Sequence, residues 1–460
     1  MSAYRETVAA ALDDGWRFAG LHASADGSCV RTLLTRREGA MRLETVGVVG
    51  GSVPSIVDLA PASAWDEREA HDLHGVRFSG HEPLRPLVDH DLELPHWTVP
   101  VHGDDPYHVA VGPIHAGVIE SGHFRFHVVG ERILHVDARL FYKHRGLERA
   151  AEAATLDEGI VFASRACAAC AVTNAVAYAH ACEEALGLVP GSELSRVRTI
   201  LLELERMWSH LNDIAAVCAG VGLAAGNNGF AALTERARRL NAALTGHRFL
   251  FGTVRVGGSA LTLDADAVRS ARAEVDALRV DSARIWHELL FNASFQDRLP
   301  EIGVVTAADV ERLGAAGPAA RAAGVEEDVR ATSARLSYGN FRVVVPRRAA
   351  GDVQARLEQR ALELLQTYAI LDGLLARPIG PAAAERSGEE RSIGVGLVES
   401  PRGATSCIVE RSGDTIERLR LRTGSYANWP SVAQAAEGGV VPDFPLVNKS
   451  FELCYACADR

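Results

Sequence analysis

Apolar side chains recur at steps of three or four residues between residues 192 and 219. This spacing places them on one face of an α-helix, because a helix completes a turn in about 3.6 residues. Pro190 and Gly191 end the preceding segment, so Ser192 is the predicted N-cap. The apolar positions of this predicted helix are Leu194, Val197, Leu201, Leu204, Trp208, Leu211, Ala215 and Cys218.

A second helix with the same spacing is predicted from about residue 353 to residue 375. Its apolar face consists of Val353, Leu357, Ala361, Leu364, Tyr368, Leu371 and Leu375. Three further helical patterns cover residues 150–187, 229–249 and 265–293. Long helices with one apolar face bury those faces against one another, so this part of the chain is predicted to be a bundle of packed helices.

Strand patterns lie on both sides of the predicted bundle. Residues 28–37 and 41–51 have the composition of two strands joined by a charged turn. The stretches 106–140 and 392–424 also have the character of strands.

These patterns predict the α+β class: a small N-terminal α/β domain, then a large, mainly helical domain with short β segments at its start and near the C-terminus. The predicted boundaries are 1–90 for the first domain, 91–105 for a linker and 106–460 for the second domain.

The length and the net charge of the chain limit the functions that it could have. A chain of 460 residues is long enough for two or three domains. Its 48 basic and 59 acidic residues give a net charge of −11, which argues against a general nucleic-acid-binding role. No uninterrupted apolar stretch approaches the ~20 residues that cross a bilayer, and the start of the chain lacks the pattern of a secretory signal. We therefore expect a cytoplasmic protein whose attachment to a membrane depends on a partner.

Four of the eight cysteines form two Cys-x-x-Cys pairs, Cys167 with Cys170 and Cys454 with Cys457. Near a helix start, positions i and i+3 share a face, so both sulfurs of a pair can reach one ion. Four thiolates make a soft, anionic site that suits zinc, nickel or iron. The 283 residues between the pairs, 171–453, disfavour a compact zinc module, but the spacing alone leaves a structural zinc site open.

Two further residues could contribute to chemistry at such a site. Glu148 follows Arg145 just upstream of the first pair and could relay protons. The alternative is an ordinary surface helix start with an Arg–Glu pair, and this motif alone is a weak signal. Arg402 lies between Pro401 and Gly403 on a tight turn and could hold a small ligand in a cavity. Without other information, an exposed turn arginine is the favoured interpretation.

The other histidines and cysteines give no second site by their spacing. His71, His74 and His81 cluster in the N-terminal region without a known catalytic spacing, so we expect them to be structural. The isolated cysteines are expected to be buried as small apolar side chains; they are Cys29, Cys182, Cys218 and Cys407.

Several longer motifs are distributed along the chain. They are Trp65–Arg85, Val111–His115, Gly122–Phe126, Arg139–Glu148, Glu203–Ile214, Gly317–Gly324, Glu399–Gly403 and Tyr426–Pro430. Together with the cysteine pairs, they resemble the large subunit of nickel–iron hydrogenases related to respiratory complex I, especially the formate hydrogenlyase and hydrogenase-4 type. The resemblance covers nearly the whole chain. In that type, a domain like the complex I 30-kDa subunit is fused to a domain like the 49-kDa subunit.

The resemblance implies a metal centre on the four paired cysteines. Cys167 and Cys454 would be terminal nickel ligands. Cys170 and Cys457 would bridge nickel to an iron that carries carbon monoxide and cyanide. The implied reaction is the reversible, heterolytic formation and cleavage of H2.

The resemblance also implies roles outside the ligand set. Glu148 would carry protons to or from a nickel-side thiolate, and Arg402 would cover the open coordination position. Electrons would pass through an iron–sulfur cluster in a separate small subunit, since this chain has no spare cysteine set for one. Further implied partners are antiporter-like membrane subunits and, in the formate type, a formate dehydrogenase. Through them the chain would lie on the inner face of the cell membrane, with no nucleic-acid partner.

The sequence departs from the family's usual pattern beside the cysteines. Ala168 and Ala169 replace Gly-Ile inside the first pair, Asn174 takes the position of a His, and Glu452-Leu453 replace Asp-Pro before the second pair. These changes leave the ligands in place but alter groups that orient them. Two other hypotheses therefore stay open: a non-catalytic structural subunit with a zinc or empty site, and a quinone-reducing subunit. The four cysteines disfavour the quinone hypothesis, because the complex I relatives have lost them.

Two expectations concern processing and electron supply. In the family a maturation protease cuts after the residue three positions beyond the last cysteine, and Arg460 stands at that position. Related systems use formate, ferredoxin or carbon monoxide as the source of electrons, and the N-terminal fusion favours the formate type.

Overall fold

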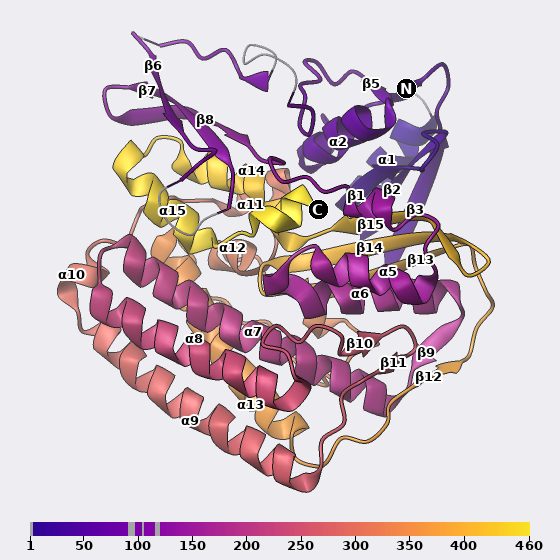
Figure 1. The fold of residues 1–460 in the computed structure, drawn as a ribbon. Coiled ribbons are helices and arrows are strands. Elements are labelled where there is room, and N and C mark those ends of the chain that lie inside the picture. Colours follow the sequence, from indigo (N-terminus) through magenta and orange to yellow (C-terminus); the bar gives the residue numbers. More distant parts are fainter. Residues whose placement is uncertain (1–2, 91–96, 104, 116–119) are drawn as a thin grey trace.

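The computed structural model describes residues 3–90, 97–103, 105–115 and 120–460. A strand-rich N-terminal region and a small sheet lie on one side of the molecule, a bundle of long helices lies on the other, and a further sheet lies between them (Figure 1). This arrangement confirms the predicted α+β class. Residues 91–96 and 104 of the predicted linker lie outside the described residues, so the domain boundaries stay a prediction.

The N-terminal region is built on an antiparallel sheet in the order β1–β2–β3. Tyr4 and Val8 of its first helix pack into the core beside the sheet. Strands β4 and β5 pair in parallel and are connected through helix α2. The elements are α1 (Ala3–Asp13), β1 (Arg17–Ala23), β2 (Cys29–Thr35), β3 (Met41–Gly47), β4 (Ser52–Pro54), η1 (Pro61–Ser63), α2 (Ala64–His74) and β5 (Arg77–Ser79). Strands β2 and β3 confirm the two strands predicted here.

A second antiparallel sheet packs against helices from the far end of the chain. Phe124 and Phe126 of β7 contact the ring of Phe444, with ring centroids 5.0 and 4.7 Å apart. The sheet thereby buries the C-terminal helices in a common apolar core. The elements are β6 (Tyr107–Val111), β7 (His123–Val129), β8 (Arg132–Arg139), α14 (Gly424–Ala436), η4 (Val441–Asp443), α15 (Phe444–Phe451) and α16 (Tyr455–Asp459).

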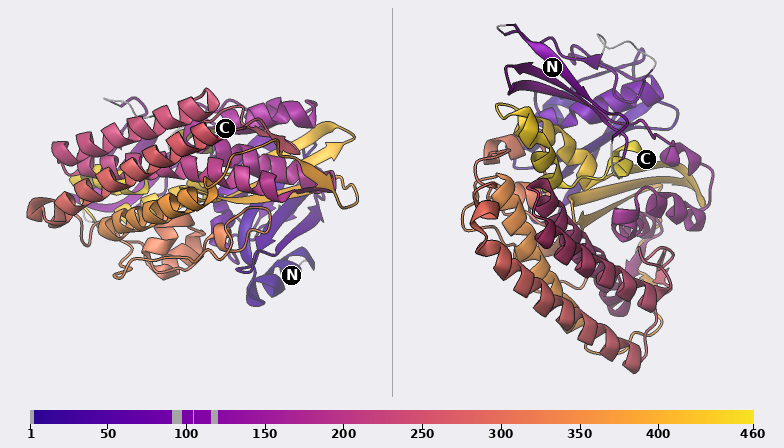
Figure 2. Two further views of the ribbon diagram at one scale, coloured as in Figure 1. Left: turned by 90° about the horizontal axis from the view of Figure 1, so that it is seen from below. Right: turned by 60° about the vertical axis from the view of Figure 1, so that its left-hand side comes forward.

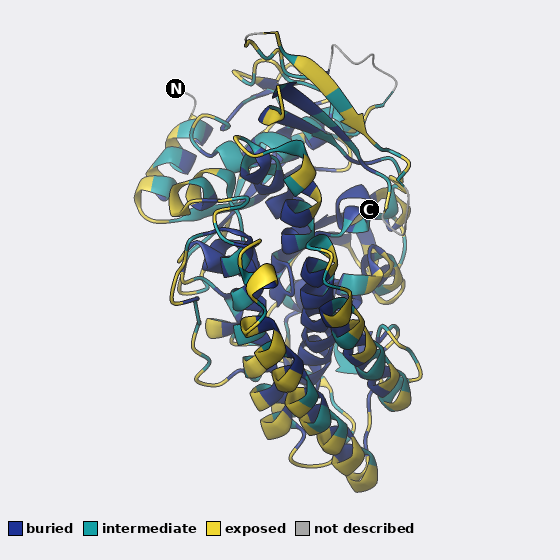
Figure 3. Ribbon diagram, turned by 90° about the vertical axis from the view of Figure 1, so that its left-hand side faces the viewer, coloured by how far each residue is buried: buried dark blue, intermediate teal, exposed yellow. Residues whose placement is uncertain are grey.

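Four long helices of the described chain form the bundle predicted from the apolar spacing, as two further views show (Figure 2). They are α7 (Ser192–Gly220), α8 (Ala224–Thr245), α9 (Ala265–Leu290) and α13 (Val353–Leu374). Their buried faces point inward and their exposed faces point to solvent (Figure 3). The predicted cap is wrong: Ser192 is the first helical residue, and the N-cap is Gly191, which makes no side-chain hydrogen bond.

The continuous helix predicted over residues 150–187 is also wrong. The backbone of Cys167 is extended, with φ −156° and ψ 132°, and the two helices around it are bent by 119°. The interruption therefore falls at the first cysteine pair. The elements observed in this stretch are α4 (Leu147–Ala150), α5 (Leu156–Arg165), the 3₁₀ turn η2 (Ala168–Cys170) and α6 (Ala171–Ala185).

Helix α6 packs against a third antiparallel sheet, in the order β13–β14–β15. Two glycines of β13 permit the close approach. A Cβ atom on Gly396 would lie 1.9 Å from the carbonyl oxygen of Ala177, and one on Gly394 would lie 2.0 Å from that of Ala181. Because the later glycine of β13 meets the earlier residue of α6, the helix and the strand run in opposite directions, and the start of α6 lies beside the end of β13. The strands are β13 (Ile393–Ser400), β14 (Gly403–Ser412) and β15 (Thr415–Arg422).

Short elements connect the larger parts. They are β9 (Leu188–Pro190), β10 (Val254–Arg255), β11 (Gly258–Ser259), α10 (Ala293–Gln296), α11 (Ala307–Leu313), α12 (Gly317–Ala322), η3 (Val329–Ala331) and β12 (Ala384–Arg386). Within the described ranges, no single helix combines the length and apolar composition needed to span a bilayer. Helices α5 and α6 do so only when taken together across their bend, and α6 is almost entirely buried in the protein core.

Candidate metal centre

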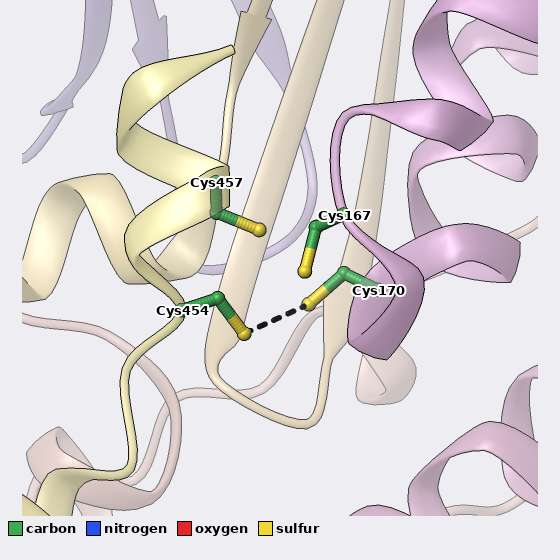
Figure 4. A group of neighbouring side chains, drawn as sticks. All are labelled: Cys167, Cys170, Cys454 and Cys457. Atoms are coloured by element: carbon green, nitrogen blue, oxygen red, sulfur yellow. Dashed lines mark hydrogen bonds between the residues drawn. The ribbon is translucent and has the colours of Figure 1, made fainter. Parts of the chain in front are cut away.

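The two Cys-x-x-Cys pairs come together with their sulfurs pointing toward one another (Figure 4). Cys167 and Cys170 lie just before α6, and Cys454 and Cys457 lie at the start of α16. All four sulfurs lie within 4.8 Å of one another, and those of Cys170 and Cys454 are 4.0 Å apart. Three of the cysteines are buried and Cys454 is half-buried. Among the residues that the structure describes, this is the one cluster with the composition of a metal site.

The start of α6 orients the first pair. Glu205 of α7 accepts hydrogen bonds from the backbone amides of Val172 (2.7 Å) and Thr173 (3.1 Å). These amides belong to the first turn of the helix, where no helical carbonyl can pair with them. Burial raises the pKa of Glu205 to about 7, although these hydrogen bonds oppose the shift. Glu205 therefore fixes the turn that follows Cys170.

Contacts on both sides of α16 hold the second pair. The backbone amide of Cys454 donates to the hydroxyl of Ser425 (3.1 Å), and the hydroxyl of Thr423 donates to the carbonyl of Cys457 (3.2 Å). Beyond the pair, the Asp459 carboxylate accepts hydrogen bonds from two backbone amides of the loop after β8 (2.8 and 3.0 Å). The segment is thus tied to two separate parts of the chain.

The four thiols influence one another's protonation. Hydrogen bonds from Cys167, Cys170 and Cys457 hold the pKa of Cys454 well below its ordinary value. Hydrogen bonding, above all with Cys167, raises the pKa of Cys170 and of Cys457. One thiolate therefore forms first, and a bound cation would favour deprotonation of the rest. The resulting donor set is soft and anionic, so it suits zinc, nickel or iron.

Arg402 lies at the turn between β13 and β14 and has only 4% of its surface exposed. The favoured interpretation as an exposed turn arginine is therefore wrong. Its Nη2 donates to Oδ1 of Asp213 (2.8 Å), and its Nε donates to the carbonyl of Glu452 (2.9 Å). Burial lowers the pKa of Arg402, but Asp213 and the thiolates of Cys454 and Cys170 raise it above its ordinary value. A charged guanidinium therefore stands beside the cysteine cluster.

Two glycines fix the turn that carries Arg402. Gly403 has φ +121°, and a Cβ atom there would lie 2.8 Å from atoms of Ala316. A Cβ atom on Gly317 would lie 2.5 Å from the Cα of Gly403. Helix α12 therefore packs directly on the turn, and a side chain at either glycine would push the two apart. This contact explains why Arg402 is covered.

Glu148 is buried at the start of α4, so its interpretation as part of a surface Arg–Glu pair is wrong. Its Oε1 accepts a hydrogen bond from the Leu421 amide (2.9 Å) and pairs with Nε of Arg460 (2.8 Å), and its Oε2 accepts from Arg418 (3.2 Å). Burial raises the pKa of Glu148, but Arg460, Arg420 and Arg418 lower it below its ordinary value. Among the described hydrogen bonds and ion pairs, none joins Glu148 to the four paired cysteines.

Acidic residues of α2 connect the N-terminal region to the same charge network. Glu69 pairs with Arg420 (2.6 Å) and with Arg460, and Asp66 pairs with Arg420 (3.0 Å) and Arg422 (3.1 Å). Arg420 and Arg422 share a face of β15, because alternate residues of a strand point the same way. Buried ion pairs therefore join the N-terminal region to the segment that carries the second cysteine pair.

A row of polar residues along α7 ends at Asp213, which pairs with Arg402, and is not among the predicted residues. Glu203, Arg206, His210 and Asp213 follow at steps of three, four and three, so they share one helix face, and all are buried. His210 Nε2 pairs with Oε2 of Glu363 on α13 (3.1 Å). The apolar stripe of the same helix dominates the sequence pattern. This second, polar stripe is the signal that could have identified Asp213.

The isolated cysteines follow the expectation with one exception. Three of them are buried as predicted: Cys182, Cys218 and Cys407. Cys29, at the first position of β2, is half-buried, so the prediction of burial is wrong there. In the N-terminal region, His81 pairs with the buried Glu67 (2.8 Å), and His71 bonds to the backbone carbonyl of Val76 (3.0 Å). Both contacts agree with the structural role expected for these histidines.

Fold and site together define an α+β protein with a buried four-cysteine cluster that could hold a metal. The family of respiratory-chain NADH dehydrogenase 30-kDa subunits matches residues 12–106, and that of the 49-kDa subunits matches residues 228–391. The chain is 30% identical over 437 residues to formate hydrogenlyase subunit 5 of Escherichia coli (strain K12), across 88% of this chain and 77% of that protein.

Two further comparisons agree. Hydrogenase-4 component G of the same organism is 30% identical over 440 residues, across 88% of this chain and 76% of that protein. A solved chain of the membrane-bound sulfane sulfur reductase, an archaeal respiratory membrane complex, is 26% identical with a TM-score of 0.70, across 77% of this chain and 99% of that one. The chain therefore belongs to the complex I-related hydrogenase large-subunit family of the formate hydrogenlyase and hydrogenase-4 type, in which 30-kDa-like and 49-kDa-like parts are fused.

Proposed function

We propose that this chain is the catalytic large subunit of a membrane-associated nickel–iron hydrogenase that forms and cleaves H2 reversibly. The observation that carries the proposal is the four-sulfur cluster with a buried, charged arginine beside it. The names of the Escherichia coli relatives, formate hydrogenlyase and hydrogenase-4, support the same reaction. Formate is the proposed source of electrons for the same reason.

The donor set of the cluster fits the proposed metals, because thiolate sulfur binds nickel and iron and can bridge two of them. Cys167 and Cys454 would bind nickel alone. Cys170 and Cys457 would bind nickel together with an iron that carries carbon monoxide and cyanide. When bound, this centre supplies the heterolytic formation and cleavage of H2.

Arg402 would cover the open coordination position of the centre. Two of its nitrogens are anchored by Asp213 and by the carbonyl of Glu452, so the position of the guanidinium is fixed. Its third nitrogen, Nη1, is buried and has no hydrogen-bond partner among the described residues. An anchored cation with an unused donor can orient a small ligand or stabilise negative charge at the cluster.

Glu148 would carry protons between the cluster and the surface. Three arginines keep it in the carboxylate form, which is the form able to accept a proton. Burial removes it from bulk water, so proton transfer would depend on the groups that surround it. The pairing with Arg460 places this carboxylate against the residue three positions beyond Cys457.

Electrons would leave through an iron–sulfur cluster in a separate small subunit. Antiporter-like membrane subunits and a formate dehydrogenase would be further partners, and the chain would lie at the inner face of the cell membrane through them. The relatives named as membrane-bound complexes support this peripheral location.

Metal analysis of the purified native complex, combined with infrared spectroscopy, tests the proposal. We expect stoichiometric nickel, together with the infrared bands of iron-bound carbon monoxide and cyanide. A matured complex with zinc and no nickel would contradict it and support a structural four-cysteine zinc site instead.

A cysteine variant separates catalysis from assembly. C457S should abolish hydrogen activity and the infrared bands while the complex stays assembled, because the side chain it replaces is a proposed ligand. C29S changes a half-buried cysteine outside the cluster and should retain both. If the C457S complex disassembles and the wild-type complex has no hydrogen activity, the four cysteines have the structural role instead. Quinone-site inhibitor sensitivity without hydrogen uptake would favour the quinone-reducing one.

A further inference from the structure

A cavity of about 360 Å³ lies between the N-terminal region and the second sheet, and none of the paired cysteines lines it. Residues of η1 and α2 line it together with residues of β8, α11 and α14 (Figure 1). Sites for small ligands range from about 300 to 1,000 Å³, so the volume suits a small ligand. The charged groups that line the cavity are Arg68, Arg85, Arg139, Arg312, His135, Asp137 and Glu437.

Most of these charged groups are already in ion pairs. The pairs are Arg85–Asp137 (3.4 Å), Arg312–Asp309 (3.0 Å), His135–Asp137 (3.4 Å) and His135–Glu437 (2.8 Å). Asp137 also pairs with the buried His127 (2.7 Å). Both acids of the cavity are therefore used by groups beside them, and neither forms an ion pair with the two remaining arginines.

Those two arginines, Arg68 and Arg139, have no acidic partner in an ion pair among the described residues. Arg68 donates instead to the backbone carbonyls of Arg85 and Pro86 (2.7 Å each). Arg139 lies over the ring of Trp97, 5.0 Å from its centroid, and donates to one backbone carbonyl (3.4 Å). Burial lowers the pKa of both, that of Arg68 to about 10. A buried cation without a counter-charge is unfavourable, so the cavity calls for an anion.

Two tryptophans of the cavity wall add N–H donors that the protein does not use. Trp97 and Trp429 are buried, and Nε1 of each has no hydrogen-bond partner among the described residues. An indole nitrogen can only donate, so an anion with several oxygens would supply the acceptors that are missing. Unpaired cations and unpaired donors thus occur in the wall of the same cavity.

We propose that this cavity binds the phosphate group of a small phosphate monoester. Such a group carries a charge of about −1.5 to −2 at pH 7 and three acceptor oxygens, which matches the two guanidinium groups without acidic partners. The planar fork of a guanidinium donates two parallel hydrogen bonds to phosphate oxygens. A lipid phosphodiester carries a single charge and would leave one guanidinium without a counter-charge.

The two arginines come from different parts of the chain. Arg68 belongs to α2 of the N-terminal region, and Arg139 is the last residue of β8. A phosphate held by both would therefore connect the N-terminal region to the second sheet. Binding should stabilise the folded chain, because a ligand that binds only the folded state shifts the unfolding equilibrium.

The experiment is thermal unfolding of the full chain in inorganic phosphate, with sodium chloride at the same ionic strength as the baseline. Phosphate should raise the unfolding temperature of the wild type above this baseline. R68Q and R139Q each remove one guanidinium group. Both should weaken phosphate binding about 10–100-fold in isothermal titration calorimetry, because each loses hydrogen bonds from a charged donor.

The matched control is R238Q on α8. Arg238 also lies over a tryptophan ring, 4.4 Å from the centroid of Trp208, and burial lowers its pKa, but it does not line the cavity. R238Q should bind phosphate as the wild type does. R139Q keeps the test decisive if R68Q does not fold, because the Arg139 side chain donates only one hydrogen bond among the described residues.

Equal unfolding temperatures in phosphate and in sodium chloride would overturn the inference. An equal phosphate affinity of the wild type, R139Q and R238Q would do the same. Vesicles of phosphatidylglycerol test a lipid as the source of the phosphate: binding that R139Q removes, without binding of inorganic phosphate, would overturn the assignment to a monoester. None of these results bears on the proposed function, since the paired cysteines lie outside the cavity.

Discussion

Asp213 connects Arg402 to the helix bundle, and replacing it by Asn tests how much this connection contributes. Its Oδ1 accepts a hydrogen bond from Arg402 (2.8 Å) and its Oδ2 accepts one from Arg360 (3.1 Å), with no part of the residue exposed. D213N keeps the size and shape of the side chain. It removes the negative charge that pairs with two buried guanidinium groups.

The expected cost follows from this burial. Removing one partner of a buried ion pair destabilises a protein by about 3–5 kcal/mol, because the other charge stays buried without compensation. The amide oxygen of Asn can still accept one hydrogen bond, so we expect the lower end, about 3 kcal/mol. The matched control is D276N. Asp276 forms an exposed ion pair with Arg279 (2.7 Å), and exposed pairs contribute ~1 kcal/mol or less.

The assay is urea unfolding of the metal-free chain, followed by both tryptophan fluorescence and circular dichroism. Coincident transitions are required before a midpoint is converted into a free energy. In the matured complex, D213N should retain its metals but lose most of its activity, since Arg402 loses an anchor. If D213N and D276N unfold at the same urea concentration, the buried pair does not stabilise the fold and the reasoning is refuted.

Two further predictions concern packing and pH. G396A should destabilise the chain by about 3 kcal/mol or prevent folding, because the added Cβ atom would lie 1.9 Å from a carbonyl oxygen of α6. The control is G47A, whose added Cβ atom would have no neighbour within 4 Å, and this variant should have the melting temperature of the wild type. Burial lowers the pKa of His135, but hydrogen bonds and charge interactions with Asp137 and Glu437 raise it to about 9. The protonated side chain therefore stabilises the fold fully below its unfolded pKa of about 6.5, and this stabilisation is lost as the pH rises through about 9. H135Q should therefore lower the melting temperature most at acidic pH, with the difference vanishing at high pH, and a difference that is constant with pH would contradict the assignment.

The regular helices could be predicted from the sequence because their apolar positions are periodic. The observed α7 ends one residue beyond the predicted helix, since its apolar stripe continues without interruption. The break at Cys167 could not be predicted in this way. The residues around it, Cys-Ala-Ala-Cys-Ala, are rich in alanine, the strongest helix former. The break depends on distant groups, including Glu205 of α7, which accepts hydrogen bonds from the start of α6, and the second cysteine pair.

The candidate site, too, has features that the sequence could predict and features that it could not. The spacing of the cysteines indicated which side chains could share an ion, and the structure brings those four sulfurs together. The environment of Arg402 could not be predicted, because an arginine on a Pro-Gly turn is buried only if another element covers the turn. Here α12 covers it and Asp213 of α7 pairs with it. Both contacts join residues far apart in the sequence.

The wide separation of the two cysteine pairs has a consequence for biosynthesis. Cys454 is made 284 residues after Cys170. At about 5–20 residues per second, a ribosome needs roughly 14–57 seconds to cover that distance. During this time the first pair is a free dithiol on an incomplete chain, able to be oxidised or to capture a stray ion. An ion can therefore be held by all four sulfurs only after Cys457 has been made, and a factor that shields the nascent Cys167–Cys170 pair would increase the yield of chains with both pairs intact.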